Sequence, residues 1–268
     1  MSNDRQQRAA RAEQMRKERE KADKKQRNLI TVAIVVIVVA LVAAGGWAIA
    51  KTSSENAVAE DVVPPASSTK DFGITYTPED AGASAAVVKK SADPVTVVLY
   101  EDFQCPVCKQ FEAAFGAALD GLVKNGDIQI EYRLLNFLDN NGGSPNGYSG
   151  RAGSAALCVY DAQGGAAYKK VHDALYAAQP EEGTNGPEAP ELIDTVKTAG
   201  ITTNAALESC IKKEKYQPWI EEGVKDSREK KVSGTPTVMV DGKTVEGQGG
   251  GVPTFDQIQA AVTAAKKA

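Results

Sequence analysis

The chain has 268 residues, of which 42% are hydrophobic and 25% are charged, and its formal net charge is −4. It contains four cysteines but one histidine, which excludes metal sites that need several histidine ligands. Residues 1–28 hold ten Lys or Arg and five acidic residues, whereas the whole chain holds 31 and 35. The chain after residue 28 therefore carries a net charge of −9, and we expect it to bind no nucleic acid.

An uncharged segment of 22 residues, 29–50, follows this basic tail. A helix of that length spans roughly 33 Å, at about 1.5 Å per residue, which is enough to cross the core of a bilayer. We predict a single transmembrane helix. Because basic residues favour the cytoplasmic side, the tail is expected in the cytoplasm and the rest of the chain outside the membrane.

Two alternatives to a membrane anchor stay open. The β-branched residues of 32–39 would suit a buried strand, although strands rarely exceed about ten residues. Ala48-Ile49-Ala50 resembles the cleavage site of a secretory signal peptide, although the apolar region of such a peptide is usually about 7–15 residues long.

Residues 51–85 lack helical or strand periodicity and contain Pro64-Pro65, Pro78 and several serines, which predicts a linker. The remaining chain, 86–268, is long enough for one globular domain with a substantial core. The cysteines are therefore not needed merely to hold a small scaffold together.

The domain begins with a pattern typical of an α/β fold. The apolar run 94–100 predicts a buried strand, and 128–137 predicts a second. Between them, apolar residues recur at steps of three and four and predict an amphipathic helix: Cys108, Phe111, Phe115, Leu119 and Leu122. Strand, helix and strand together form a βαβ unit.

The second half of the domain is predicted to be mainly helical. Residues from about 145 to 230 are rich in Ala, Lys, Glu and Leu, with a turn-rich interruption at 179–190. A β-hairpin follows at 235–246, with Asp241-Gly242 as a two-residue turn, and 253–267 predicts a closing helix.

Cys105-Pro106-Val107-Cys108 lies where the first strand gives way to the helix. Proline favours the first helical position, so Cys105 is the expected N-cap, where free backbone N–H groups and the helix dipole stabilise a thiolate. Cys108, one turn further and on the apolar stripe, is expected to be buried and to resolve a mixed disulfide formed at Cys105. A zinc site, a Cu(I)-binding pair and a passive structural disulfide are the alternatives.

The other two cysteines, Cys158 and Cys210, are 52 positions apart in the helical region. Spacing alone does not separate the three possible pairings of four cysteines. If Cys105 and Cys108 act as a redox pair, however, Cys158 and Cys210 are left as partners, either structural or regulatory. We expect His172 to lie on a helix surface with no assigned role.

With Phe103-Gln104-Cys105-Pro106-Val107-Cys108-Lys109 after a strand and Gly234-Thr235-Pro236-Thr237 before a late hairpin, the chain resembles the DsbA-like branch of the thioredoxin superfamily. It is most similar to membrane-anchored actinobacterial members, over roughly residues 86–268. The resemblance implies a thioredoxin fold with a helical insertion, and no cofactor or metal. It also implies a cis-proline at Pro236 beside the cysteine pair, with backbone groups of Thr235 binding an extended substrate peptide.

The resemblance further implies a thiol:disulfide oxidoreductase that introduces disulfides into reduced, exported proteins through Cys105 and Cys108. A membrane partner of the DsbB or VKOR type would reoxidise it. Alternative functions are an extracytoplasmic reductase or isomerase, a Cu(I) carrier, and a binding or chaperone module with an inert disulfide.

Two positions depart from the family pattern. Many relatives have a buried acid six residues before the first cysteine, where this chain has Leu99; Glu101 and Asp102 lie nearby. Enterobacterial DsbA proteins have Pro-His between the cysteines, whereas this chain has Pro106-Val107 and so lacks a donor there. We therefore predict a weaker oxidant, because its reduced thiolate is less stabilised.

Overall fold

The computed structural model describes residues 62–90 and 93–267. The described residues belong to one compact unit, Asp61–Ala268. The predicted basic tail and the predicted transmembrane helix at 29–50 lie outside the described residues. Within the described part of the chain, no helix has both the length and the apolar character needed to cross a membrane.

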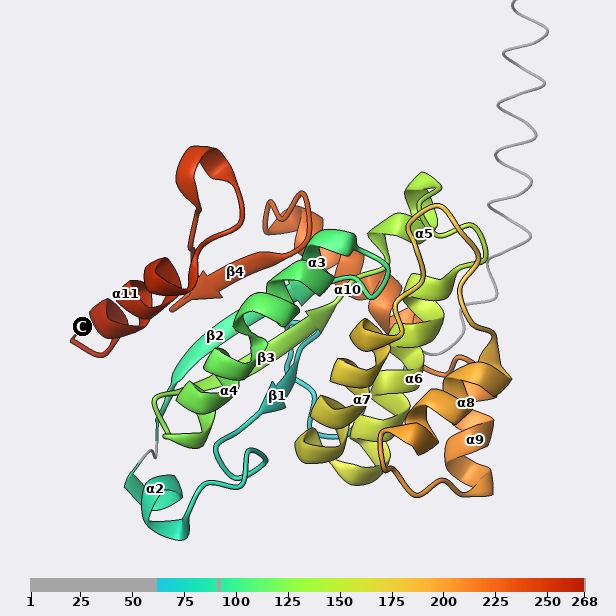
Figure 1. The fold of residues 1–268 in the computed structure, drawn as a ribbon, viewed down its shortest axis with the longest axis horizontal. Coiled ribbons are helices and arrows are strands. Elements are labelled where there is room, and N and C mark those ends of the chain that lie inside the picture. Colours follow the sequence, from blue (N-terminus) through green and yellow to red (C-terminus); the bar gives the residue numbers. More distant parts are fainter. Residues whose placement is uncertain (1–61, 91–92, 268) are drawn as a thin grey trace, which may run out of the picture. The chain divides into compact units, whose positions relative to one another are not determined.

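A five-stranded mixed sheet lies at the centre of the domain, in the order β1-β3-β2-β4-β5 (Figure 1). The two central strands run parallel, with Val95 opposite Ile128 and Glu101 opposite Leu134. The other pairs are antiparallel. The strands are β1 (Ile74–Tyr76), β2 (Val95–Glu101), β3 (Ile128–Leu134), β4 (Thr237–Val240) and β5 (Lys243–Thr244).

The predicted βαβ unit is present. The crossover between β2 and β3 is helical throughout, but it contains a π-helical turn that the apolar periodicity did not predict. Its segments are α3 (Pro106–Phe111), the π-helical η1 (Glu112–Gly116) and α4 (Ala117–Lys124).

Strand β2 is buried on both faces, which explains its continuous apolar sequence. Val97 and Leu99 belong to the main core, whereas Val98 and Tyr100 pack on the opposite face in a smaller core that includes Val224 of α10. Because Glu101 has the same parity as Leu99, its side chain points toward the main core.

The prediction of a linker over 51–85 is wrong for residues 74–76, which lie in its described part. Residues 74–76 form the edge strand β1, which pairs with β3, and the side chains of Ile74 and Tyr76 are 1% and 4% exposed. A strand of three residues is too short to show a periodicity of two, and the prolines around it gave the segment the composition of a loop. The folded unit therefore begins near Asp61 rather than at residue 86.

Helices fill the region expected to be a helical insertion, between β3 and β4. The turn-rich interruption separates α7 from α8, as predicted. The helices are α5 (Phe137–Asn141), α6 (Tyr148–Gln163), α7 (Gly165–Ala177), α8 (Ala189–Thr198), α9 (Ala205–Lys212) and α10 (Gln217–Glu229). A short helix, α2 (Ala85–Lys90), precedes β2.

The hairpin of β4 and β5 is also present, and Asp241 and Gly242 have φ values of 51° and 70°. Two positive φ values match the two-residue turn that Asp-Gly favours. The closing helix α11 (Phe255–Ala265) begins at Thr254, whose side chain and that of Gln257 form a capping box.

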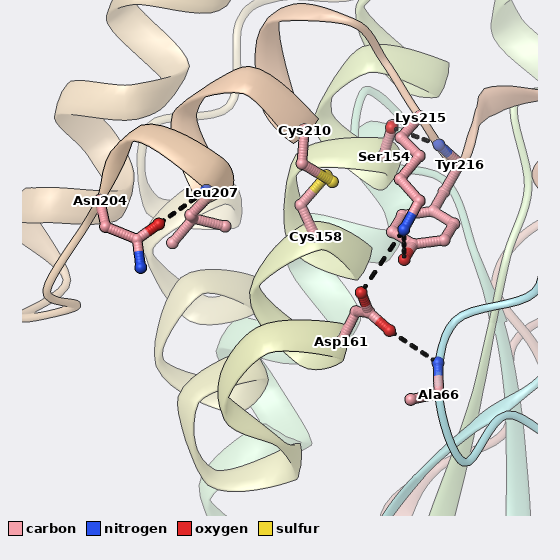
Figure 2. The surroundings of a disulfide bond; sticks show 9 residues. All are labelled: Ala66, Ser154, Cys158, Asp161, Asn204, Leu207, Cys210, Lys215 and Tyr216. Carbon is pink, nitrogen blue, oxygen red and sulfur yellow. Dashed lines mark hydrogen bonds and ion pairs between the residues drawn. A yellow bond between two sulfur atoms is a disulfide. The ribbon is translucent and has the colours of Figure 1, made fainter.

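Cys158 of α6 and Cys210 of α9 form a disulfide, which agrees with the predicted pairing. Figure 2 shows the bond between the two helices, close to the ion pair of Asp161 and Lys215. Asp161 also accepts a hydrogen bond from the backbone N–H of Ala66, which ties the start of the described chain to the insertion.

Candidate active site

Cys105 lies at the N-terminus of the helical crossover, as predicted. Its backbone is extended, with φ −70° and ψ 117°, and Pro106 occupies the first turn of α3. The pKa of Cys105 is lowered to about 6, chiefly by the hydrogen bond with the Cys108 side chain. Burial opposes this shift. Hydrogen bonds with the Thr235 side chain and with the backbone N–H groups of Cys108 and Val107 add to it. The site therefore favours the Cys105 thiolate near neutral pH.

Cys108 has the opposite character. Its side chain is 0% exposed, and burial, the hydrogen bond to Cys105 and the negative charge of Glu101 raise its pKa well above the ordinary value. Cys105 is thus stabilised as a thiolate, whereas Cys108 is held as a protonated thiol, and both cysteines are buried.

The Thr235–Pro236 peptide bond is cis and lies beside the cysteine pair, although the two segments are 130 residues apart. The pairing of β4 with β2 sets Thr237 opposite Tyr100 and so carries this loop to the end of β2. The Cys105 thiol donates a hydrogen bond to the Thr235 carbonyl over 3.4 Å. The structure thus brings together Cys105, Cys108, Thr235 and Pro236.

A groove of about 350 Å³ begins at this loop. It is lined by the segment 231–238, by residues 244–246 of the hairpin and by the glycine-rich segment 250–253. Val252, which lines the groove, and Val107 of α3 are among the few large apolar side chains that are exposed in the described part of the chain. The groove lies beside Thr235, whose carbonyl contacts the Cys105 sulfur.

The segment before Cys105 is held by the helical insertion. The side-chain amide of Gln179 donates to the carbonyls of Phe103 (3.0 Å) and Cys105 (2.9 Å). The Gln104 amide donates in turn to the carbonyls of Glu181 and Thr184. These contacts fix the backbone from which Cys105 projects.

The buried carboxylate of Asp102 also holds the segment before Cys105. Its carboxylate accepts hydrogen bonds from the backbone N–H groups of Gln104 and Leu138 and from the Ser149 hydroxyl. Burial raises the pKa of Asp102 to about 6 despite these bonds. Asp102 is therefore part of the scaffold of the active-site loop.

The prediction that His172 lies on a helix surface is wrong. Its side chain is 0% exposed, with Nε2 2.9 Å from Glu101 Oε2 and Nδ1 3.0 Å from Asp173 Oδ1. Aromatic rings surround it, among them Tyr168 and Tyr176. These two residues are four positions before and after His172, so the aromatic spacing in the sequence already indicated a buried face.

The buried acid near the cysteines is Glu101. It lies two residues after Leu99, on the same face of β2. Glu112 of η1 lies close to both Glu101 and His172. Burial and the charge of Glu101 raise the pKa of Glu112 to about 8. Burial opposes protonation of His172, but its hydrogen bonds to Asp173 and Glu101 outweigh that effect and raise its pKa to about 9.

The comparisons with known proteins agree with this geometry. The family model described as thioredoxin matches residues 85–264 of the chain. The structure is similar to that of the reduced disulfide bond oxidoreductase DsbG from Mycobacterium tuberculosis, with 28% identity, a TM-score of 0.58, and coverage of 74% of this chain and 88% of that one. It is also similar to oxidised DsbA of the same organism, with 29% identity, a TM-score of 0.57, and coverage of 72% and 91%.

A curated relative of different architecture is the serine/threonine-protein kinase PknE of Mycobacterium tuberculosis. It is 32% identical over 128 residues, which are 47% of this chain and 22% of the kinase. The chain thus matches less than a quarter of that protein's length.

Proposed function

The chain belongs to the thioredoxin family, and from that premise we propose that it is a DsbA-type thiol:disulfide oxidoreductase. The observation that carries the proposal is the asymmetry of its cysteine pair. Cys105 is stabilised as a thiolate beside cis-Pro236, and Cys108 is held as a buried thiol. The DsbG and DsbA structures of Mycobacterium tuberculosis support the same activity, whereas the short match to PknE supports no kinase activity.

The reaction proceeds from the oxidised protein, in which Cys105 and Cys108 form a disulfide. A substrate thiolate attacks the sulfur of Cys105, the Cys105–Cys108 bond breaks, and Cys108 leaves with the electron pair and takes up a proton. A second substrate thiolate then attacks the substrate sulfur of the mixed disulfide, and Cys105 leaves as a thiolate. Two electrons pass from the substrate to the protein, and the substrate gains a disulfide.

The low pKa of Cys105 favours this direction. A stabilised thiolate is a good leaving group and stabilises the reduced protein, which makes the disulfide form more oxidising. A pKa of about 6 lies between those of thioredoxin, about 7, and of the strongly oxidising DsbA, about 3.5. We therefore propose an oxidant weaker than the enterobacterial DsbA proteins.

The proposal includes a location and partners. An anchor at 29–50 would hold the catalytic domain outside the cell membrane, where disulfides persist. The substrates would be reduced or unfolded exported proteins, which bind as extended segments along the groove beside Thr235. A membrane protein of the DsbB or VKOR type would take the two electrons from the reduced pair.

The central test is the oxidation of a reduced dithiol peptide by the oxidised full chain. We expect Cys105→Ser to lower the rate to that of the uncatalysed reaction, because no mixed disulfide can form at residue 105. A variant that keeps full activity would refute the proposal. The reduction potential separates the rival reductase, since a value near that of thioredoxin, about −270 mV, would favour it.

Location is tested separately with a maleimide that does not cross membranes. Applied to intact cells under mild reduction, it is expected to label Cys105. Labelling only after the cells are lysed would contradict the proposed topology.

A further inference from the structure

Three buried or partly buried titratable side chains meet beside the cysteine pair, each from a different element. They are Glu101 at the end of β2, Glu112 in η1 and His172 in α7. One ligand atom of each, a carboxylate oxygen or an imidazole nitrogen, lies within 4.8 Å of the others. We propose that this cluster, Glu101–Glu112–His172, binds a divalent cation of the Zn²⁺ class.

The orientation of His172 is the first support. Its Nδ1 lies 3.0 Å from a carboxylate oxygen of Asp173, and its Nε2 points toward Glu101. Histidines that bind metals usually donate one ring N–H to a carboxylate in this way, which turns the lone pair of the other nitrogen toward the metal. If Nδ1 carries the proton donated to Asp173, the lone pair of Nε2 faces the Glu101 carboxylate, and both groups are acceptors. Their short distance then requires either a proton or a cation between them.

The two carboxylates provide the second support. Among the described residues, neither Glu101 Oε1 nor Glu112 Oε1 has a hydrogen-bond partner, and the Glu101 side chain is 0% exposed. A buried acceptor without a donor costs free energy, more so when it is charged. Coordination to a cation would satisfy both oxygens.

The charges of the surrounding residues fit a dication. With Glu101, Glu112 and Asp173 ionised, His172 neutral and Lys169 paired with Asp173, the five side chains would carry a net charge of −2. The excess of two negative charges is balanced either by one divalent cation or by two protons.

A cavity reaches one member of the cluster. Its volume is about 560 Å³, and its lining includes Glu112, Gly116, Lys169 and Asp173 but neither Glu101 nor His172. At Gly116 a β-carbon would stand 2.7 Å from Glu112 Oε2, so glycine leaves the room that this carboxylate occupies. The π-helical turn carries Glu112, which lines this cavity, and such turns occur frequently at functional sites.

The donor set suits zinc. Two carboxylate oxygens and one imidazole nitrogen leave a fourth position for water from the cavity, as in open zinc sites with three protein ligands. Bonds of about 2.1 Å place tetrahedral ligand atoms about 3.4 Å apart, so shifts of about an ångström close the site.

The test is Zn²⁺ binding to the full chain, measured by titration calorimetry in a Cys105→Ser/Cys108→Ser background. Because Cys158 and Cys210 are bonded to each other, no free thiol remains to bind the metal. We expect one Zn²⁺ per chain with a micromolar or tighter Kd. The result is independent of the proposed disulfide exchange, since this background cannot carry out that reaction.

Isosteric variants locate the site. Glu112→Gln is expected to weaken binding at least about 100-fold, and Asp173→Asn about 10- to 100-fold through the lost orientation of His172. Asp120→Asn is the matched control, because Asp120 lines the same cavity outside the cluster and bonds Tyr76, and it should leave the affinity unchanged. No binding in the background protein, or binding that Glu112→Gln leaves intact, would overturn the proposal and assign the charge balance to two protons.

Discussion

The two cysteine pairs of this domain differ in their positions along the helices and in whether they are bonded. Cys105 is the N-cap of a helix, with free N–H groups and the positive end of the dipole at its sulfur. Cys158 lies deep within α6, and Cys210 lies in the last turn of α9, where the dipole is negative. The first pair consists of free thiols and the second is a disulfide.

Because all four residues are cysteines, their positions along the helices account for the different reactivity of the two pairs. A thiolate at a helix start is stabilised, leaves readily and can exchange. A pair in a helix interior and a last helical turn gains no such stabilisation, and its bond joins α6 and α9 (Figure 2). The predictions below test this contrast, from the largest expected effect to the smallest.

Replacing Cys108 by alanine should trap the reaction halfway. The mixed disulfide at Cys105 then has no resolving thiol, so incubation with a peptide disulfide is expected to give a covalent adduct visible by mass spectrometry. Cys105→Ala should give none, because Cys108 is buried and protonated. Equal trapping by both variants would show that the two thiols are not distinguished.

Removing the second pair should affect stability and not chemistry. In the chain-entropy model, a crosslink over 52 residues contributes about 4 kcal/mol, so Cys158→Ala/Cys210→Ala is expected to lower the free energy of unfolding by about that amount. Denaturant unfolding of the oxidised proteins measures the loss.

The matched control is Cys105→Ala/Cys108→Ala, whose crosslink closes a loop of only a few residues and should contribute about half as much, about 2 kcal/mol. Peptide oxidation by the folded Cys158→Ala/Cys210→Ala protein should keep its rate. A strong loss of rate would instead indicate a regulatory disulfide.

The alkylation of Cys105 by iodoacetamide should depend on pH as its pKa requires. The thiolate is the reactive form, so the rate should be half-maximal near pH 6, level off above about pH 7 and fall roughly tenfold per pH unit below about pH 5. In Cys108→Ala the midpoint should move upward, because the hydrogen bond from Cys108 is the largest cause of the low pKa. A midpoint near 9 in the unmodified chain would contradict the stabilised thiolate.

Local signals in the sequence were enough to predict the reactive end of the domain. Pro106 predicted the helix start and hence the N-cap position of Cys105, and Asp241-Gly242 predicted the turn of the hairpin. Both depend on backbone preferences of one or two residues, which tertiary structure did not override.

The contact of Glu101 with His172, near the cysteine pair, was harder to predict, because the two residues meet only in the folded structure. Glu101 and His172 are 71 positions apart, and no spacing links them. The edge strand β1 was missed for a related reason: its three residues gain their stability from β3, more than 50 positions later in the chain. Long-range pairing leaves no local pattern in so short a segment.

The last prediction concerns the contact that joins the insertion to the active site. Gln179 binds the carbonyls on either side of Gln104, and each neutral hydrogen bond contributes about 0.5–1.5 kcal/mol. Gln179→Ala should therefore lower the free energy of unfolding by about 1–3 kcal/mol. Because it also frees the backbone that carries Cys105, it should slow peptide oxidation several-fold.

Gln163→Ala, which removes one exposed side-chain hydrogen bond on α6, is the control and should change neither the free energy of unfolding nor the oxidation rate appreciably. If Gln179→Ala lowered stability but left the oxidation rate unchanged, the insertion would support the domain without positioning Cys105.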